Sequence, residues 1–317
     1  MNFHTARFMS TACLPFAFDP DAQCQRWEGF LDEVLPDPES RQLLQEVFGY
    51  SLTHDTSQQK FFVFVGSGGN GKSVVQQVLL SLLEPANVSA VPLKQFGEKF
   101  ALAVTLGKLV NLTSEAGDFT REGEEQLKRF TGGEVMQFER KYGAPFPAKP
   151  TARLIVSTNE LPKIHDRSDG LWRRLIVLPF LVTIPEEKRK PHLVDELRQE
   201  LSGIFLWAVA GAQRLQERGR FIEPDSCRVA WDTFKRDSNS ARLFLEEHYQ
   251  ARQGGEVGTV ALYSHYRDFC QKNTLTVLNR PDFTKEVKRV FPDSTIKKVR
   301  LKGSRPHMVV GIVPREE

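Results

Sequence analysis

The chain has 317 residues, 40% of them hydrophobic and 26% charged, and a formal net charge of +3, which is typical of a soluble globular protein with room for two or three domains. No apolar run is long enough to span a bilayer, and the N-terminus lacks the apolar stretch of a signal peptide, so we expect a cytoplasmic protein without a membrane partner. Its four scattered cysteines form no C-x-x-C motif, which gives zinc or redox chemistry no support.

The first predicted unit, residues 1–57, is helical. In "DPESRQLLQEVFGYSL", Asp37 is a capping residue, Pro38 fits the first helical position, and apolar residues repeat at i, i+4. No strand signal precedes Lys60. We expect this unit to serve oligomerisation.

A phosphate-binding loop follows a predicted buried strand. "FFVFV" (Phe61–Val65) is a continuous apolar run, and the next residues fit G-x-x-x-x-G-K-[ST] before a stretch with helical spacing, 73–83. Glycines allow positive φ and close backbone approach to phosphate. The predicted ATP-binding residues are Gly66, Ser67, Gly68, Gly69, Asn70, Gly71, Lys72 and Ser73. We expect Lys72 to reach the β- and γ-phosphates and Ser73 to ligate Mg²⁺, so the predicted cofactors are ATP and Mg²⁺.

Two further polar residues follow apolar strands. Glu115 ends "KLVNLTSE", where an acid can polarise water or bind Mg²⁺, and Asn159 ends "ARLIVSTN", where an amide can orient the water. The usual pattern is Asp-Glu, but Ser114 precedes Glu115 here, and Asp118 is a possible substitute acid. The alternative is that Glu115 simply ends a strand in solvent.

Alternating apolar runs and helical stretches predict an α/β ATPase domain over residues 58–232. After it, residues 233–317 show two helices and then two strands joined by Gly303-Ser304, the order of a winged helix. The segment 257–315 carries twelve Lys and Arg against four Asp and Glu, which favours a polyanionic partner over a merely solvated basic face. The predicted duplex-DNA contacts of this domain are Lys285, Lys288, Arg289, Lys297, Lys298, Arg300 and Lys302, with Lys288, Lys297 and Lys298 foremost.

The motifs "GSGGNGKS", "LVNLTSE", "LKRFTGGE…ERKYGAPFPAKPTARLIVSTNELP" and "DGLWRRLIVLPF" occur in one order with tight spacing. Over about residues 15–232 they resemble the superfamily 3 helicases, specifically the helicase part of phage and plasmid primase-helicases and their poxvirus relatives. The resemblance implies a P-loop AAA+-like core and a homo-oligomeric ring, usually a hexamer, with ATP sites between subunits. Such a ring would move 3′ to 5′ on single-stranded DNA at the replication fork of a mobile element in a bacterial or archaeal host. The resemblance also implies a primase, as a separate chain or a missing domain.

The same resemblance assigns DNA contacts and a trans-acting arginine. "GGEVMQFERKYGAPF" resembles the hairpin that faces the ring channel, where Arg140 and Lys141 would grip phosphates, and Lys149 also matches. Glu139 departs from the family and would weaken the local field; the alternative is an exposed edge hairpin with protective charges. In "GLWRRL", Arg174 is favoured over Arg173 as the arginine finger, and the alternative is two surface salt-bridge arginines.

The leading hypothesis is therefore an ATP-dependent DNA helicase. An ATP-switched DNA-binding initiator or loader without net unwinding, and an RNA helicase or packaging-type motor on the same core, are the alternatives.

Overall fold

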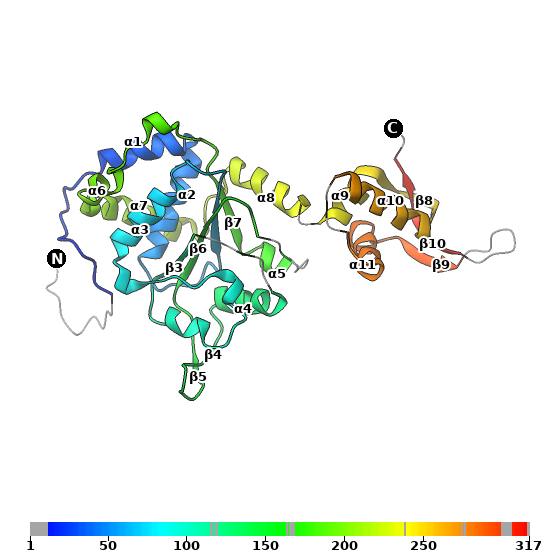
Figure 1. Ribbon diagram of the computed structural model, residues 1–317, viewed down its shortest axis with the longest axis horizontal. Helices are drawn as coiled ribbons and strands as arrows, with labels where there is room; N and C mark the ends of the chain where they lie inside the picture. The colour runs from blue at the N-terminus through cyan, green and yellow to red at the C-terminus, as the bar shows by residue number, and fades with distance from the viewer. Residues whose placement is uncertain are drawn as a thin grey trace. The chain divides into compact units, whose positions relative to one another are not determined.

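The structure is a computed structural model, and it divides into two compact units, Met1–Trp231 (unit 1) and Asp232–Glu317 (unit 2), each described here by itself (Figure 1). The described residues are 12–114, 117, 120–162, 164, 169–237, 239–273, 275, 277–298 and 306–315. Within them, no helix is long and apolar enough to cross a membrane.

Unit 1 is built on a five-stranded parallel sheet in the order β2-β3-β6-β1-β7. Its strands are β1 (Phe61–Val65), β2 (Val88–Ser89), β3 (Val110–Thr113), β6 (Arg153–Thr158) and β7 (Leu175–Pro179). The long central strands are almost wholly buried, as expected for a parallel sheet covered on both faces. The three apolar runs expected to be strands are confirmed as β1, β3 and β6, and the carboxyl ends of the parallel strands meet at one edge of the sheet.

Helices surround the sheet, and the last of them, α8, leads away from it (Figure 1). They are α1 (Gln25–Val34), α2 (Pro38–Ser51), α3 (Lys72–Leu83), α4 (Arg121–Thr131), α5 (Asp169–Trp172), α6 (Leu193–Arg198), α7 (Leu201–Arg218) and α8 (Asp225–Asp237), with short 3-10 helices at Pro85–Asn87, Leu93–Gln95, Ala101–Thr105 and Glu186–Lys188. Asp37 caps α2 as expected, accepting hydrogen bonds from the backbone N–H groups of Glu39 and Ser40 at 3.2 and 3.3 Å.

The N-terminal helices share one core with the sheet. Trp27 of α1 and Phe48 of α2 pack on Trp207 of α7, with ring centroids 5.5–5.6 Å apart. Gly211 of α7 lies against the backbone of Gln45, so a Cβ there would collide with α2. This close packing places residues 25–51 in unit 1; a separate oligomerisation unit over 1–57 stays a prediction.

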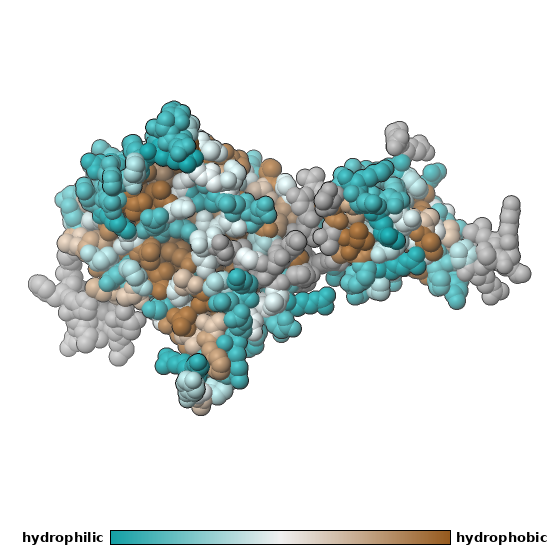
Figure 2. Space-filling model, in the orientation of Figure 1, coloured by the Kyte–Doolittle hydropathy of each residue, from teal (hydrophilic) through white to brown (hydrophobic). Residues whose placement is uncertain are grey.

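A two-stranded hairpin, β4 (Met136–Phe138) and β5 (Phe146–Ala148), projects from unit 1 (Figure 1). Phe138 faces Phe146 across the pair, and Met136 and Phe138 are buried at its base. Figure 2 shows hydrophilic side chains at the end of the hairpin and apolar ones at its base. The hairpin is thus anchored by apolar packing and presents a polar tip.

Unit 2 contains α9 (Ser240–His248), β8 (Tyr249–Gly258), α10 (Thr259–Lys272), α11 (Arg280–Val290), β9 (Thr295–Lys298) and β10 (His307–Pro314). The strands form an antiparallel sheet in the order β8-β10-β9, and Phe244, Tyr266 and Phe283 lie in the core. The expected helix, helix, strand, strand order is confirmed. The sequence did not indicate β8, because "YQARQGGEVG" has no apolar alternation and gains strand structure through pairing with β10.

Candidate nucleotide site and DNA-contacting elements

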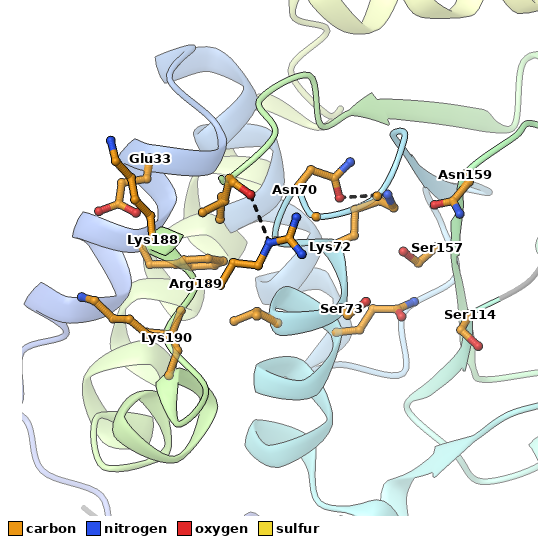
Figure 3. A pocket seen from close by; sticks show the side chains of 18 of the residues that line it. Glu33, Asn70, Lys72, Ser73, Ser114, Ser157, Asn159, Lys188, Arg189 and Lys190 are labelled. Atoms are coloured by element: carbon orange, nitrogen blue, oxygen red, sulfur yellow. Dashed lines mark hydrogen bonds between the residues drawn. The ribbon is translucent and has the colours of Figure 1, made fainter. Parts of the chain in front are cut away.

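A cavity of about 990 Å³ opens at the carboxyl edge of the parallel sheet (Figure 3). The phosphate loop forms one wall and the ends of β3 and β6 form another. The third wall comes from α1 and from residues 184–196, which lie far from the loop in sequence.

The loop conformation depends on its glycines. Gly68, Gly69 and Gly71 have φ of +103°, +61° and +85°, a region that favours glycine. A Cβ on Gly71 would lie 2.7 Å from Cγ1 of Val34 in α1, and a Cβ on Gly66 would collide with the carbonyl oxygen of Phe180. Helix α3 begins at Lys72, so its free N-terminal N–H groups and positive dipole end face the cavity.

Lys72 is held inside the loop. It is 5% exposed, and its Nζ donates to the Gly66 carbonyl oxygen at 2.6 Å and to Oδ1 of Asn70 at 2.9 Å. Asn70 in turn donates through Nδ2 to the Phe180 carbonyl oxygen at 3.2 Å. Burial disfavours the charged ammonium and lowers the pKa of Lys72. Among the residues that the structure describes, Lys72 donates only to neutral oxygens, so a phosphate group would supply a counter-charge.

The structure brings the loop and Asn159 together. The Gly66 N–H donates to the Thr158 carbonyl oxygen at 3.3 Å, and Asn159 follows directly, exposed and lining the cavity. Ser114, at the end of β3, also lines it, and Nε2 of Gln76 ties α3 to this strand end by donating to the Thr113 carbonyl oxygen at 3.0 Å. The predicted acid Glu115 and its substitute Asp118 lie outside the described residues.

A magnesium ion fits the residues present. The described residues contain no group of three His, Cys, Asp or Glu side chains placed to hold a metal. Mg²⁺ usually keeps several waters and takes one or two protein ligands plus substrate phosphates. The exposed Ser73 hydroxyl lines the cavity at the start of α3, which suits that kind of donor set.

The two candidate fingers differ sharply in environment. Arg174 is 8% exposed, donates to the Gly170 carbonyl oxygen, and has a pKa lowered first by burial and then by Arg173. Arg173 is exposed, and its carbonyl oxygen accepts a hydrogen bond from Nζ of Lys60 at 2.6 Å. Neither side chain lines the cavity of its own chain.

The hairpin carries the predicted DNA contacts, with Arg140 and Lys141 at its tip and Lys149 directly after β5. Arg140, Lys141 and Lys149 are exposed; the Arg140 guanidinium lies 5.5 Å from the centroid of the Phe146 ring. Tyr142 is 95% exposed with φ of +66°, and Nζ of Lys141 lies 5.3 Å from its ring centroid. Glu139 pairs with Lys99 at 3.3 Å, so a base from another segment offsets the acid that the sequence placed in this motif.

Unit 2 presents part of its predicted basic surface. Lys288 on α11 and Lys297 and Lys298 on β9 are exposed. Lys285 pairs with Asp282 at 3.0 Å and Arg289 with Glu286, so these two are partly neutralised. Arg300 and Lys302 lie outside the described residues.

Sequence reasoning missed the third wall of the cavity. Phe30 and Glu33 of α1 and the basic run 188–190 line it. The only sequence signal was the charged run "EEKRK" (186–190), which resembles the polar start of a helical stretch.

Two family models match separate parts of the chain. Residues 64–174 match a family of unknown function, DUF5906, and residues 238–316 match the RFX DNA-binding domain. The second match agrees with the fold of unit 2, which is a winged helix of the RFX type.

Among curated proteins, the chain is 29% identical over 171 residues to "Putative helicase L207/L206" of Acanthamoeba polyphaga mimivirus, covering 51% of this chain and 18% of that protein. It is 23% identical over 279 residues to "Putative helicase 022R" of Frog virus 3 (isolate Goorha), covering 77% and 28%. Unit 2 is similar to "Transcription factor RFX4" of Mus musculus, 34% identical over 73 residues, 23% of this chain and 10% of that protein. The chain therefore spans less than a third of the length of these relatives.

Among solved structures, the apo structure of the NrS-1 C-terminal region (305-718) is similar, with a TM-score of 0.58 and 14% identity, covering 93% of this chain and 79% of that one. This likeness shows a shared fold. Together with the viral relatives and the ordered motifs, it confirms the resemblance seen in the sequence. The chain is similar to the superfamily 3 helicases, and within them to the helicase part of viral and phage primase-helicases.

Proposed function

We propose that this chain is an ATP-dependent DNA helicase of a virus, phage, plasmid or other mobile element, acting as a ring motor on single-stranded DNA during replication. The observation that carries the proposal is the cavity in which the phosphate loop and Asn159 meet, at the carboxyl ends of the adjacent strands β1 and β6. A phosphate loop alone binds nucleotide, whereas a loop beside a water-orienting amide is arranged for hydrolysis.

The side chains have distinct roles in this proposal. Lys72 and the N–H groups at the start of α3 stabilise the charge of the β- and γ-phosphates. Ser73 holds Mg²⁺, Glu115 polarises the attacking water, and Asn159 orients it. The sheet order supports an AAA+-like core, because β6 separates β1 from β3 and so sets Asn159 between the loop and the end of β3.

An arginine supplied by a neighbouring subunit completes the site. Because neither Arg173 nor Arg174 lines the cavity of its own chain, either would have to act in trans, which requires an oligomer such as a hexameric ring. The sequence favoured Arg174, but its burial and its hydrogen bond to Gly170 suit a structural role. The exposed Arg173 is the better candidate for insertion into a neighbour's site.

DNA would meet two different surfaces. The hairpin tip, with Arg140 and Lys141, would follow single-stranded DNA in the ring channel, aided by Lys149. The basic face of unit 2, with Lys288, Lys297 and Lys298, would hold duplex DNA through its phosphates. Forked DNA presents both kinds of substrate.

ATPase measurements with single-stranded DNA and with single-stranded RNA test this proposal. Turnover should rise with DNA. It should fall to background in Lys72→Ala, which removes the cation that binds the phosphates. A Lys72→Ala protein with turnover near that of the wild type would remove the nucleotide site from the proposal, and stronger stimulation by RNA would favour an RNA motor.

The alternative function is an ATP-switched initiator or loader that binds DNA without net unwinding. The RFX-type winged helix of unit 2 favours it, because such a module suits duplex DNA at a fixed site. Strand displacement separates the two functions, since a switch hydrolyses ATP without releasing a strand.

A further inference from the structure

The segment after β7 is fastened to the phosphate loop by a chain of hydrogen bonds. The Ile184 N–H donates to the Gly69 carbonyl oxygen at 2.8 Å, and Nε of Arg189 donates to the Ile184 carbonyl oxygen at 3.1 Å. The 3-10 turn Glu186–Lys188 brings Arg189 back toward the loop, and the Arg189 N–H donates to the Glu186 carbonyl oxygen at 3.1 Å. The backbone and the Nε of this arginine are therefore both fixed.

The guanidinium group of Arg189 lies directly on Gly69. A Cβ on Gly69 would be 2.5 Å from a terminal nitrogen, Nη2, of Arg189. Gly69 also has φ of +61°, so this position requires glycine both for its backbone conformation and for the arginine that covers it.

The terminal nitrogens of Arg189 are available to a ligand. Within the part of the chain that the structure describes, Ile184 is the only residue to which the Arg189 side chain donates a hydrogen bond. Figure 3 shows the guanidinium pointing toward Asn70 and Lys72, whereas Lys188 and Lys190 extend away from the loop. One member of the basic run is thus directed at the phosphate-binding end of the cavity.

We propose that Arg189 is a second phosphate-binding cation, which contacts the polyphosphate of the nucleotide bound in its own subunit. This inference rests on the proposed nucleotide site and assigns a residue of it that the motif does not contain. The planar fork of an arginine can donate two parallel hydrogen bonds to phosphate oxygens. Because Nε is already tied to Ile184, little side-chain freedom is lost when the terminal nitrogens bind.

Arg189 and Arg173 have separable roles. Arg189 lies at the site of its own chain and contributes to nucleotide affinity, whereas Arg173 acts on a neighbour and contributes to turnover. Loss of Arg189 should therefore weaken binding even in dilute protein where no ring forms.

The test is equilibrium binding of ATP and ADP, in the presence of Mg²⁺ and without DNA. It compares wild type, Arg189→Ala, Arg189→Lys, Lys72→Ala, and the control Arg198→Ala. Arg198 is an exposed arginine of α6 that pairs with Asp195 and does not line the cavity. Arg189→Ala should bind ATP roughly tenfold to a hundredfold more weakly, the range of a charge-assisted hydrogen bond. Arg189→Lys should recover only part of this loss. The control Arg198→Ala should bind ATP like the wild type.

Thermal unfolding of each variant shows whether the loss is one of binding or of folding. A second experiment measures ATP binding by Gly69→Ala. This substitution should weaken binding less in the Arg189→Ala protein than in the wild type, because the new Cβ then no longer collides with the Arg189 guanidinium. The inference is overturned if Arg189→Ala binds ATP and ADP like the wild type while Lys72→Ala does not. If the wild type binds neither nucleotide, or Lys72→Ala binds both normally, the proposed nucleotide site itself fails, and the role of Arg189 fails with it.

Discussion

Arg173 and Arg174 are neighbours in sequence, yet Arg174 is buried and donates to Gly170 while Arg173 is exposed. The burial follows from position, because Arg174 immediately precedes β7 and its carbonyl oxygen accepts the N–H of Phe61 at 2.8 Å. The two arginines should therefore respond differently to substitution.

Arg173→Ala should leave ATP binding and the melting temperature intact and cut ATP turnover by up to about 10³-fold, since an arginine in trans stabilises transition-state charge. Arg174→Ala should instead lower the free energy of unfolding by about 1–3 kcal/mol, because it removes a buried hydrogen bond. ATPase rates and thermal unfolding of both variants check this. If Arg174→Ala loses turnover at unchanged stability and Arg173→Ala does not, Arg174 is the arginine finger.

Mixtures of variants test action in trans. Arg173→Ala subunits keep a good phosphate loop, and Lys72→Ala subunits keep a good arginine, so a mixed ring can assemble complete sites. Partial recovery of ATPase on mixing is expected. No recovery at any ratio, from a protein that stays monomeric with ATP and DNA, would exclude shared sites.

Ser73→Ala should raise the Mg²⁺ concentration needed for half-maximal ATPase activity, because the hydroxyl that lines the cavity is the proposed protein ligand. Ser67→Ala is the matched control, an exposed serine of the same loop with no proposed metal role. Titration of Mg²⁺ against ATPase rate measures both. Equal Mg²⁺ dependence in the two variants would contradict the assignment.

Glu115→Gln should bind ATP and hydrolyse it poorly, because the amide keeps the shape of the side chain and loses the charge that polarises water. Asp118→Asn is the matched comparison, as the possible substitute acid. Single-turnover hydrolysis and nucleotide binding distinguish the two. Normal hydrolysis by Glu115→Gln together with loss in Asp118→Asn would move the catalytic acid to Asp118.

Lys141→Ala should abolish unwinding and DNA-stimulated ATPase while sparing basal ATPase, because the hairpin tip lies away from the nucleotide cavity. Arg228→Ala serves as a control, an exposed base of α8 that pairs with Asp225. ATPase rates with and without single-stranded DNA provide the measurement. Undiminished DNA stimulation of the ATPase in Lys141→Ala would mean that the hairpin is an exposed sheet edge with protective charges and not a DNA contact.

Combined substitution of Lys288, Lys297 and Lys298 by alanine should weaken duplex binding and flatten its salt dependence, each lost phosphate contact lowering the log–log slope by roughly 0.9. The control is Arg242→Ala, because the Arg242 side chain pairs with Glu246 at 2.6 Å.

Truncation after Asp237 should weaken duplex binding more than the triple substitution does. It should leave the ATPase response to single-stranded DNA unchanged. An unchanged slope in the truncated protein would mean that the basic face is solvated or docks protein.

Local sequence patterns predict much of the fold and of the nucleotide site. The strand, loop and helix around Lys72 and the strand ending at Asn159 are readable because each is a continuous apolar run followed by the functional residue. Parallel strands then bring their carboxyl ends together, so Asn159 reaches the loop as expected.

The features that the sequence did not indicate depend on contacts between segments that are far apart in the chain. Arg189 meets Gly69 only because the turn 186–188 folds back on the loop, and nothing in "EEKRK" distinguishes the arginine from its neighbours. The Lys99 that offsets Glu139 lies 40 residues before it in sequence. Strand β8 is polar and depends on β10 for its structure.

Strand displacement on a forked DNA duplex at saturating ATP and Mg²⁺ tests the central claim most directly. We expect the labelled strand to be released with ATP, to stay paired with a non-hydrolysable analogue, and to stay paired with the Lys72→Ala protein. Hydrolysis of ATP on the same fork with no strand released would contradict a helicase and leave an ATP-switched initiator or loader.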